Sequence, residues 1–152
     1  MEIRRFGPGH RRPEGPPGTR GVSGAVLMSE DRAVVTEVAF GPYAMITPHS
    51  NETNTALFIV ISGGGFVQVG EERARVNHGE AVLWPVGVPH GAYTDGTEMR
   101  AIIVELVGDE TRVVDSKAAP GADPTPAKRA RGALAERQRT RDEYDKSEGE
   151  PW

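Results

Sequence analysis

The strongest structural signal in this chain lies in residues 57–76, which read LFIVISGGGFVQVGEERARV. Residues 57–61 are β-branched or large and apolar, as strand residues commonly are. Val67 and Val69 alternate with polar neighbours, which is the pattern of a half-buried strand. Glycines 63–65 and the Gly-Glu-Glu sequence at 70–72 interrupt the apolar runs where turns are expected. The stretch predicts short antiparallel strands joined by tight turns.

Similar runs lie on both sides of this stretch. Residues 34–40, 81–84 and 99–106 are rich in valine, isoleucine and leucine, and no helical period separates them. Short strands at this spacing are typical of an antiparallel sandwich or barrel. Residues 57–61 are apolar at all five positions, so both faces of that strand must be covered. One face can line a barrel, and the other must meet a second sheet, the N-terminal arm or another subunit.

The apolar residues are concentrated in the middle of the chain. The overall hydrophobic fraction is 37%. Residues 25–108 contain 40 hydrophobic residues among 84, about 48%, whereas the other 68 residues contain 16, about 24%. We therefore expect one barrel domain over residues 25–112, between two poorly apolar flanks.

The two flanks have different compositions. Residues 1–24 are rich in glycine, proline and arginine, which predicts a flexible, extended or disordered arm. Residues 113–152 form a linker and a charged tail, in which residues 127–146 favour helix but carry only a narrow apolar stripe. An exposed helix, a frayed helix and a helix that binds a partner all remain open for this tail.

Composition excludes several classes of protein. No window holds the ~20 consecutive apolar residues of a membrane helix, and the N-terminal residues lack the apolar segment of a secretory signal. The chain has no cysteine, which excludes disulfides, thiolate metal sites and cysteine nucleophiles. Residues 25–108 carry 4 basic and 10 acidic side chains, which argues against a nucleic-acid-binding barrel. We expect a cytoplasmic protein that binds neither membranes nor nucleic acids.

Two of the four histidines lie where a barrel could bring them together. His49 precedes the strand at residues 57–61, and His90 follows the strand at residues 81–84. Residues 79–94 read GEAVLWPVGVPHGAYT. This stretch resembles the second motif of the cupins, G-x5-P-x-G-x2-H-x3-N, and departs from it only at Thr94. The resemblance covers about residues 25–108 and implies an all-β double-stranded β-helix, the jelly-roll barrel of small single-domain cupins.

The first cupin motif, G-x5-H-x-H-x3,4-E-x6-G, is matched only in part. His49 fits its first histidine and Gly63 its last glycine, but Asn51 replaces the second histidine, Ala56 the glutamate and Tyr43 the leading glycine. In the family, three histidines and the glutamate typically hold a divalent metal such as Mn, Fe, Ni or Zn. Here the resemblance carries over two of these four ligands.

The candidate site follows from these two motifs. His49 and His90 are the candidate catalytic residues and metal ligands, and Asn51 could add a weak oxygen ligand because i and i+2 share a strand face. The resemblance adds Ala56, Phe58 and Tyr93 as pocket residues. Glu52 could contribute a carboxylate if its loop bends inward.

Three functions remain open. The leading interpretation is a small-molecule-binding cupin whose cavity contains His49, Asn51 and His90, either metal-free or weakly metal-binding. The second is a metal-dependent cupin enzyme of the dioxygenase or isomerase type. The third is a dimeric scaffold whose arginine-rich tail binds a partner. A homodimer is expected in each case because of the doubly apolar strand at residues 57–61, and the resemblance points the same way.

Overall fold

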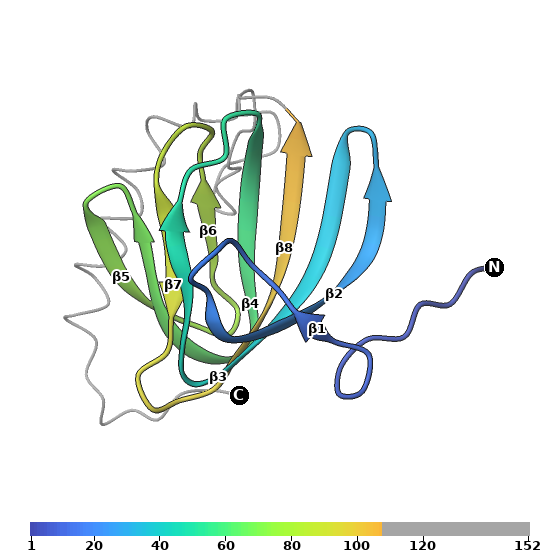
Figure 1. The fold of residues 1–152 in the computed structure, drawn as a ribbon, viewed down its shortest axis with the longest axis horizontal. Helices are drawn as coiled ribbons and strands as arrows, with labels where there is room; N and C mark the ends of the chain where they lie inside the picture. Colours follow the sequence, from blue (N-terminus) through green and yellow to red (C-terminus); the bar gives the residue numbers. More distant parts are fainter. Residues whose placement is uncertain (108–152) are drawn as a thin grey trace, which may run out of the picture. The chain divides into compact units, whose positions relative to one another are not determined.

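The computed structural model describes residues 1–107, and within this range the chain is an all-β barrel (Figure 1). The predicted helix at residues 127–146, the linker and the upper barrel boundary at residue 112 lie outside the described residues. The eight strands are β1 (Arg12–Pro13), β2 (Arg20–Glu30), β3 (Ala33–His49), β4 (Asn54–Val69), β5 (Glu72–Asn77), β6 (Ala81–Trp84), β7 (His90–Tyr93) and β8 (Met99–Val107). No helix among these residues is long and apolar enough to cross a membrane.

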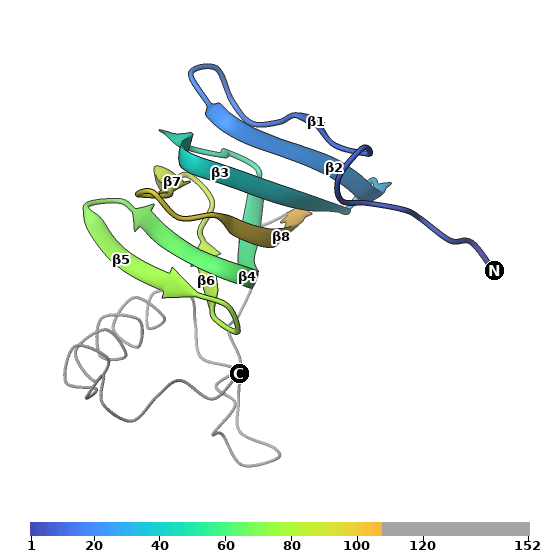
Figure 2. The ribbon, with the colours of Figure 1, turned by 90° about the horizontal axis from the view of Figure 1, so that it is seen from below.

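Two long strands close the barrel. β3 has 17 residues and β4 has 16, and each pairs with β8 along one half and with β7 along the other. All pairings are antiparallel, and their cycle β3–β8–β4–β7 returns to its starting strand, as Figure 2 shows from below. The predicted double-stranded β-helix of the cupins is confirmed.

The core lies on the inner faces of these strands. Val38 and Phe40 from β3, Phe58 and Val60 from β4, and Ala101 from β8 are each at most 2% exposed. Alternation places successive side chains of a strand on opposite faces, so each strand contributes every second residue to this core. Burial of such side chains is the main stabilising contribution, about 1.5–3 kcal/mol for each large one.

The outer face of the 57–61 segment is only half covered. Leu57 and Ile59, which alternate with the core residues of β4, are half-buried, and Ile61 is 41% exposed. The sheet neighbours of Leu57 and Ile59 on β8 are Val104 and Ile102. An apolar strip therefore remains on the outside of the barrel, and residues 1–107 do not provide the full cover that the sequence predicted for this face.

The barrel begins earlier than the sequence predicted. β2 starts at Arg20 rather than after residue 24, and β1 pairs with it through Arg12 and Pro13. Arg11 adds a tertiary contact, because its guanidinium donates to both carboxylate oxygens of Glu37 at 2.9 and 2.6 Å. Part of the predicted arm is therefore an ordered edge of the sheet.

Candidate functional site

The candidate site starts at His49, the last residue of β3, where the strand is irregular. Ile46 pairs with Ala92, whereas three residues later His49 pairs with His90, only two residues away from Ala92 on β7. The extra residue on β3 is a β-bulge, which shifts the alternation of side chains by one position. His49 therefore shares the inner face with Ile46, although strict alternation would place it outside.

His90 opens β7 and faces His49 across the ladder. The two imidazole centroids lie 4.7 Å apart with the ring planes inclined by 64°. His90 is 2% exposed, whereas His49 is half-buried. The structure thus brings together the two histidines that the sequence singled out.

Both imidazoles are held in the same way by the backbone. Nδ1 of His49 lies 3.0 Å from the carbonyl oxygen of Thr47, and Nδ1 of His90 lies 2.8 Å from that of Val88. A carbonyl oxygen can only accept, so each Nδ1 carries the proton and donates. In the neutral rings each Nε2 then keeps a lone pair for a ligand or a metal.

The environment keeps His90 neutral. Burial lowers the pKa of His90 to about 4, an effect that the hydrogen bond to Val88 partly offsets and the neighbouring charge of His49 reinforces. At neutral pH this imidazole is therefore an acceptor at Nε2, not a cation.

A column of aromatic rings continues from His90 into the barrel. Trp84, the last residue of β6, stacks on His90 at 4.5 Å and on Phe58 at 4.8 Å between ring centroids. Phe40 contacts the edge of Phe58 at 6.1 Å. Trp84 was not predicted as a site residue, although it lies six residues before His90 in the matching motif.

Gly91 makes room for the bulge of β3. A Cβ atom at this position would lie 2.8 Å from the carbonyl oxygen of Ile46 and 3.2 Å from the nitrogen of Pro48. Both contacts are closer than the strand could accept without moving. The second motif therefore supplies His90 and, beside it, the glycine that lets His49 approach.

Asn51 does not share a strand face with His49, because β3 ends at His49. Its Oδ1 instead accepts hydrogen bonds from the backbone nitrogens of Thr53 and Asn54 at 3.2 and 3.1 Å, and from the Thr53 hydroxyl. This turn uses the oxygen that was predicted as a weak metal ligand. Glu52 is exposed and accepts a hydrogen bond from Ser50, so the loop does not turn its carboxylate inward.

The three predicted pocket residues fall on different faces. Ala56 and Phe58 are buried on the inner face of β4, where Ala56 pairs with Trp84. Tyr93 lies on the outer face, because it is three residues from His90 along β7, and it stacks on Phe66 at 5.0 Å. Tyr93 is therefore not a wall of the barrel interior.

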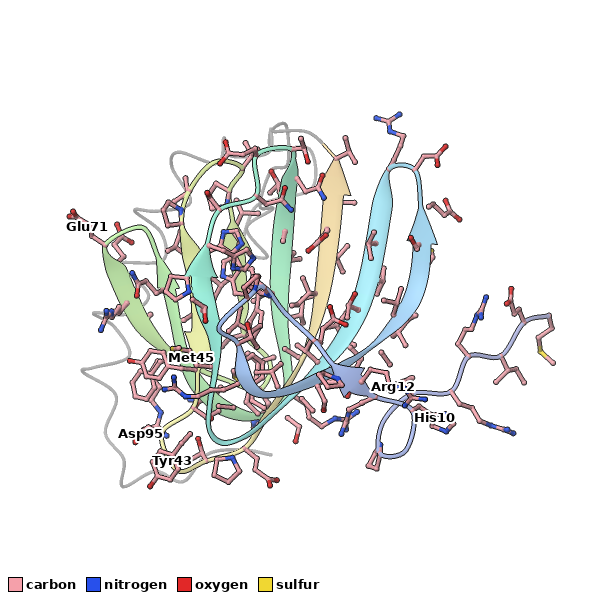
Figure 3. All side chains as sticks on the ribbon, viewed as in Figure 1. His10, Arg12, Tyr43, Met45, Glu71 and Asp95 are labelled. Carbon is pink, nitrogen blue, oxygen red and sulfur yellow. The ribbon has the colours of Figure 1, made fainter. Side chains whose placement is uncertain are left out.

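Thr94, where the second motif departs from the cupin pattern, has a structural role. Its hydroxyl donates to the carbonyl oxygen of Gly41 at 2.6 Å and accepts from the backbone nitrogen of Ala44 at 2.9 Å. Between these two residues Tyr43 adopts a φ of 57°. Thr94 thus stabilises an irregular turn of β3, and Figure 3 shows Tyr43 at the opposite end of the barrel from the loops that follow β3 and β6.

The described residues supply two imidazole ligands for a metal. Within residues 1–107 no group of three histidine or carboxylate side chains could hold a metal ion. His10 lies beside β1, away from the upper end of the barrel (Figure 3). Protein metal sites usually have three or four ligands, so these residues do not fit the four-ligand cupin centre.

Two hollows on the described part of the surface lie away from His49 and His90. One of about 650 Å³ is lined by the N-terminal arm and β2, with Arg4, Arg5 and His10 among its residues. Another of about 560 Å³ lies along residues 13–23. His49 and His90 lie next to two loops, residues 50–53 and 85–89, which are joined by a hydrogen bond from the Gly87 nitrogen to the Asn51 carbonyl oxygen at 2.8 Å.

A closed antiparallel barrel with two histidines facing each other at one end is the architecture of a cupin. Residues 36–107 match the family model Cupin_2, described as a cupin domain. The barrel of this chain is therefore a cupin-2-like domain. Among curated proteins, none matches the chain significantly.

Solved structures with the same fold have varied descriptions. The polyketide cyclase RemF from Streptomyces resistomycificus is 24% identical, with a TM-score of 0.58, and the match covers 76% of this chain and 89% of RemF. A predicted oxalate decarboxylase from Thermotoga maritima is 18% identical, with a TM-score of 0.60 and coverage of 64% and 90%. KdgF from Halomonas sp. is 22% identical, with a TM-score of 0.55 and coverage of 61% and 84%. At these identities the likeness concerns the fold alone.

Proposed function

We propose that this protein binds a small organic molecule at the His49–His90 pair, and that the two imidazoles orient the ligand through their Nε2 atoms. The observation that carries the proposal is the shared backbone anchoring of both rings through Nδ1. Rings that are fixed in this way present their free nitrogens without loss of side-chain entropy on binding, which favours a defined ligand geometry. We place this activity in the cytoplasm, in line with a chain that has no cysteine.

Position in the fold supports the proposal. His49 ends β3 and His90 begins β7, so both side chains lie where strands give way to loops at one end of the barrel. Figure 1 shows the loops that follow β3 and β6 at the same, upper end. Ligand sites commonly lie at the mouths of β-barrels, because loops can open there while the strands stay fixed.

Native mass spectrometry of the full chain, purified without denaturant, tests the proposal. A small molecule that co-purifies with the wild type and is lost in both His49→Gln and His90→Gln is the expected result. His78→Gln is the matched control, since His78 is exposed and lies in the β5–β6 turn. Retention of the same molecule by both site variants would contradict the proposal.

A metal-dependent enzyme is the second candidate, and one observation favours it. An imidazole that donates through Nδ1 to a backbone carbonyl is oriented as metal-bound histidines usually are. A two-histidine centre would need water or ligand oxygens to complete its coordination. The described residues do not provide the family's other two ligands, so we assign no step to a metal.

Elemental analysis separates the two candidates. The protein is purified without chelator and without added metal. Less than about 0.1 equivalent of Mn, Fe, Ni or Zn, together with no thermal shift when these ions are added, would exclude the enzyme interpretation. A bound ion that is lost in both His49→Ala and His90→Ala would instead replace the metal-free proposal.

A further inference from the structure

The indole N–H of Trp84 is an unsatisfied polar group inside the barrel. Trp84 is 2% exposed, and its Nε1 has no hydrogen-bond partner among residues 1–107. A buried donor without an acceptor is rare in native proteins, because its desolvation is not compensated. The structure therefore calls for an acceptor that residues 1–107 do not supply, either a buried water or a ligand.

Trp84 packs against aromatic rings, and its only polar atom, the buried Nε1, lies at the edge of the indole. His90 and Phe58 stack at 4.5 and 4.8 Å from the indole centroid, at interplanar angles of 20° and 26°. With the ring faces in contact with these neighbours, a new partner must approach the edge, where Nε1 is the only polar atom. An oxygen acceptor suits this donor.

The histidines beside Trp84 need a hydrogen-bond donor from the ligand, whereas Trp84 needs an acceptor. Each Nδ1 donates to a backbone carbonyl, so the Nε2 atom of each ring is an acceptor when that ring is neutral. A complementary ligand must therefore carry both an acceptor and a donor. A carboxylate offers only acceptors, and the buried arginine contacts of this barrel, from Arg11 and Arg100, are made with Glu37 on the outer face.

We propose that Trp84 is a ligand-binding residue, and that the site takes a neutral hydroxycarbonyl compound whose carbonyl oxygen accepts from the indole N–H while its hydroxyl donates to Nε2 of His90 or His49. This inference rests on the proposed function, because it assigns a ligand class to the same site. Neutrality follows from the absence of a cationic partner for a buried anion among the described contacts of the site.

The experiment uses the full chain with ¹⁵N-labelled tryptophan and histidine. The chain has two tryptophans, so Trp152→Phe assigns the indole signal of Trp84. The probes are meta- and para-hydroxyacetophenone. Para-methoxyacetophenone, which lacks the hydroxyl donor, and para-ethylphenol, which lacks the carbonyl acceptor, are the matched controls. The hydroxyketones are expected to shift both the Trp84 N–H signal and the His90 Nε2 signal, and to bind more tightly than either control.

The variant Trp84→Phe keeps an aromatic ring in the column and removes the N–H. We expect it to weaken hydroxyketone binding about threefold to tenfold, the effect of one neutral hydrogen bond. It should leave the weaker binding of para-ethylphenol unchanged. The histidine signals of the variant report whether the His49–His90 pair keeps its wild-type arrangement.

The outcomes separate the ligand class from the proposed function. One outcome is that probes shift the histidine signals and yet bind the Trp84→Phe variant as tightly as they bind the wild type. This result would contradict the role of Trp84 but would still support ligand binding at the His49–His90 pair. An indole signal that no probe moves would indicate a buried water on Nε1 and would overturn the hydroxycarbonyl assignment. A co-purified ligand that depends on both histidines but carries no carbonyl oxygen would overturn it as well.

Discussion

At the level of single residues, the approach of His49 to His90 depends on Gly91, which has no side chain. We predict that Gly91→Ala separates His49 from His90, because the new Cβ would lie 2.8 Å from the carbonyl oxygen of Ile46. Overpacking of this kind costs about 1–3 kcal/mol of unfolding free energy. Chemical denaturation measures the loss, and the histidine ¹⁵N signals report the separation.

Gly41→Ala is the matched control for this substitution. The Cβ at position 41 would meet only a backbone oxygen of Gly21 at 3.6 Å, an ordinary contact. The control should therefore keep both the stability and the histidine signals of the wild type. Equal stability of the Gly91 and Gly41 variants would show that the bulge tolerates a side chain and would contradict the prediction.

His90 makes a pH-dependent contribution to stability. Its pKa falls from about 6.5 in the unfolded chain to about 4 in the fold, so the folded state prefers the neutral ring. This contribution is fully present above about pH 6.5 and is lost as the pH falls toward 4. The midpoint temperature of thermal unfolding should therefore fall more steeply between pH 7 and pH 4 for the wild type than for His90→Gln. Parallel declines would contradict the assignment.

At the scale of the elements, a charged cluster holds the N-terminal arm to the sheet in addition to the pairing of β1 with β2. Glu37, which is fully buried on the outer face of β3, contacts Arg11 at 2.6 Å and Arg100 at 3.1 Å. Hydrogen bonds from Arg11 and Arg100 lower the pKa of the Glu37 carboxyl, although burial opposes this effect. Glu37 therefore adds side-chain contacts from the arm and from β8 to the backbone pairing of β3 with β8.

We predict that Arg11→Ala destabilises the barrel by about 1.5–3 kcal/mol, because it removes a charged hydrogen-bond partner from a buried carboxylate. Proteolysis of residues 1–19 should also become faster, because the arm loses this tertiary contact. Denaturation and limited trypsin digestion measure the two effects. Arg5→Ala, at an exposed position of the arm, should change neither the stability nor the cleavage of the remaining sites. Unchanged stability of Arg11→Ala would contradict the prediction.

At the scale of the whole molecule, the outer apolar strip of β4 predicts self-association. Ile61 is 41% exposed, and Leu57 and Ile59 beside it are half-buried. We propose that a second copy of the chain covers this strip, since exposed apolar strips commonly mark interfaces. Light scattering should give the mass of a dimer at micromolar concentration, and Ile61→Asp should shift it toward the monomer. A monomeric wild type would contradict this.

Much of the barrel was predictable because its signals are local. The alternation in residues 67–69 and the spacing from Gly79 to His90 both act within a few residues. The turn predicted at glycines 63–65 is wrong, because β4 runs through them from Asn54 to Val69 and stays paired with β8 and then β5. Trp84 could have been found by its position in the second motif, but its unsatisfied N–H depends on contacts with Phe58 and His90. The role of Gly91 could not be seen, because its neighbour Ile46 is distant in the sequence.

The all-β cupin barrel, the two less apolar flanks and the central pair His49 and His90 were all predictable from the residues alone. Strand periodicity and turn residues are local properties, so they can be read without coordinates. Three features depend on long-range pairing and could be seen only in the fold: a bulge turns His49 inward, Asn51 Oδ1 is used in a turn, and Tyr93 faces outward. One extra residue in a strand reverses which face a side chain occupies, and the pairing register that reveals it is set by a distant strand.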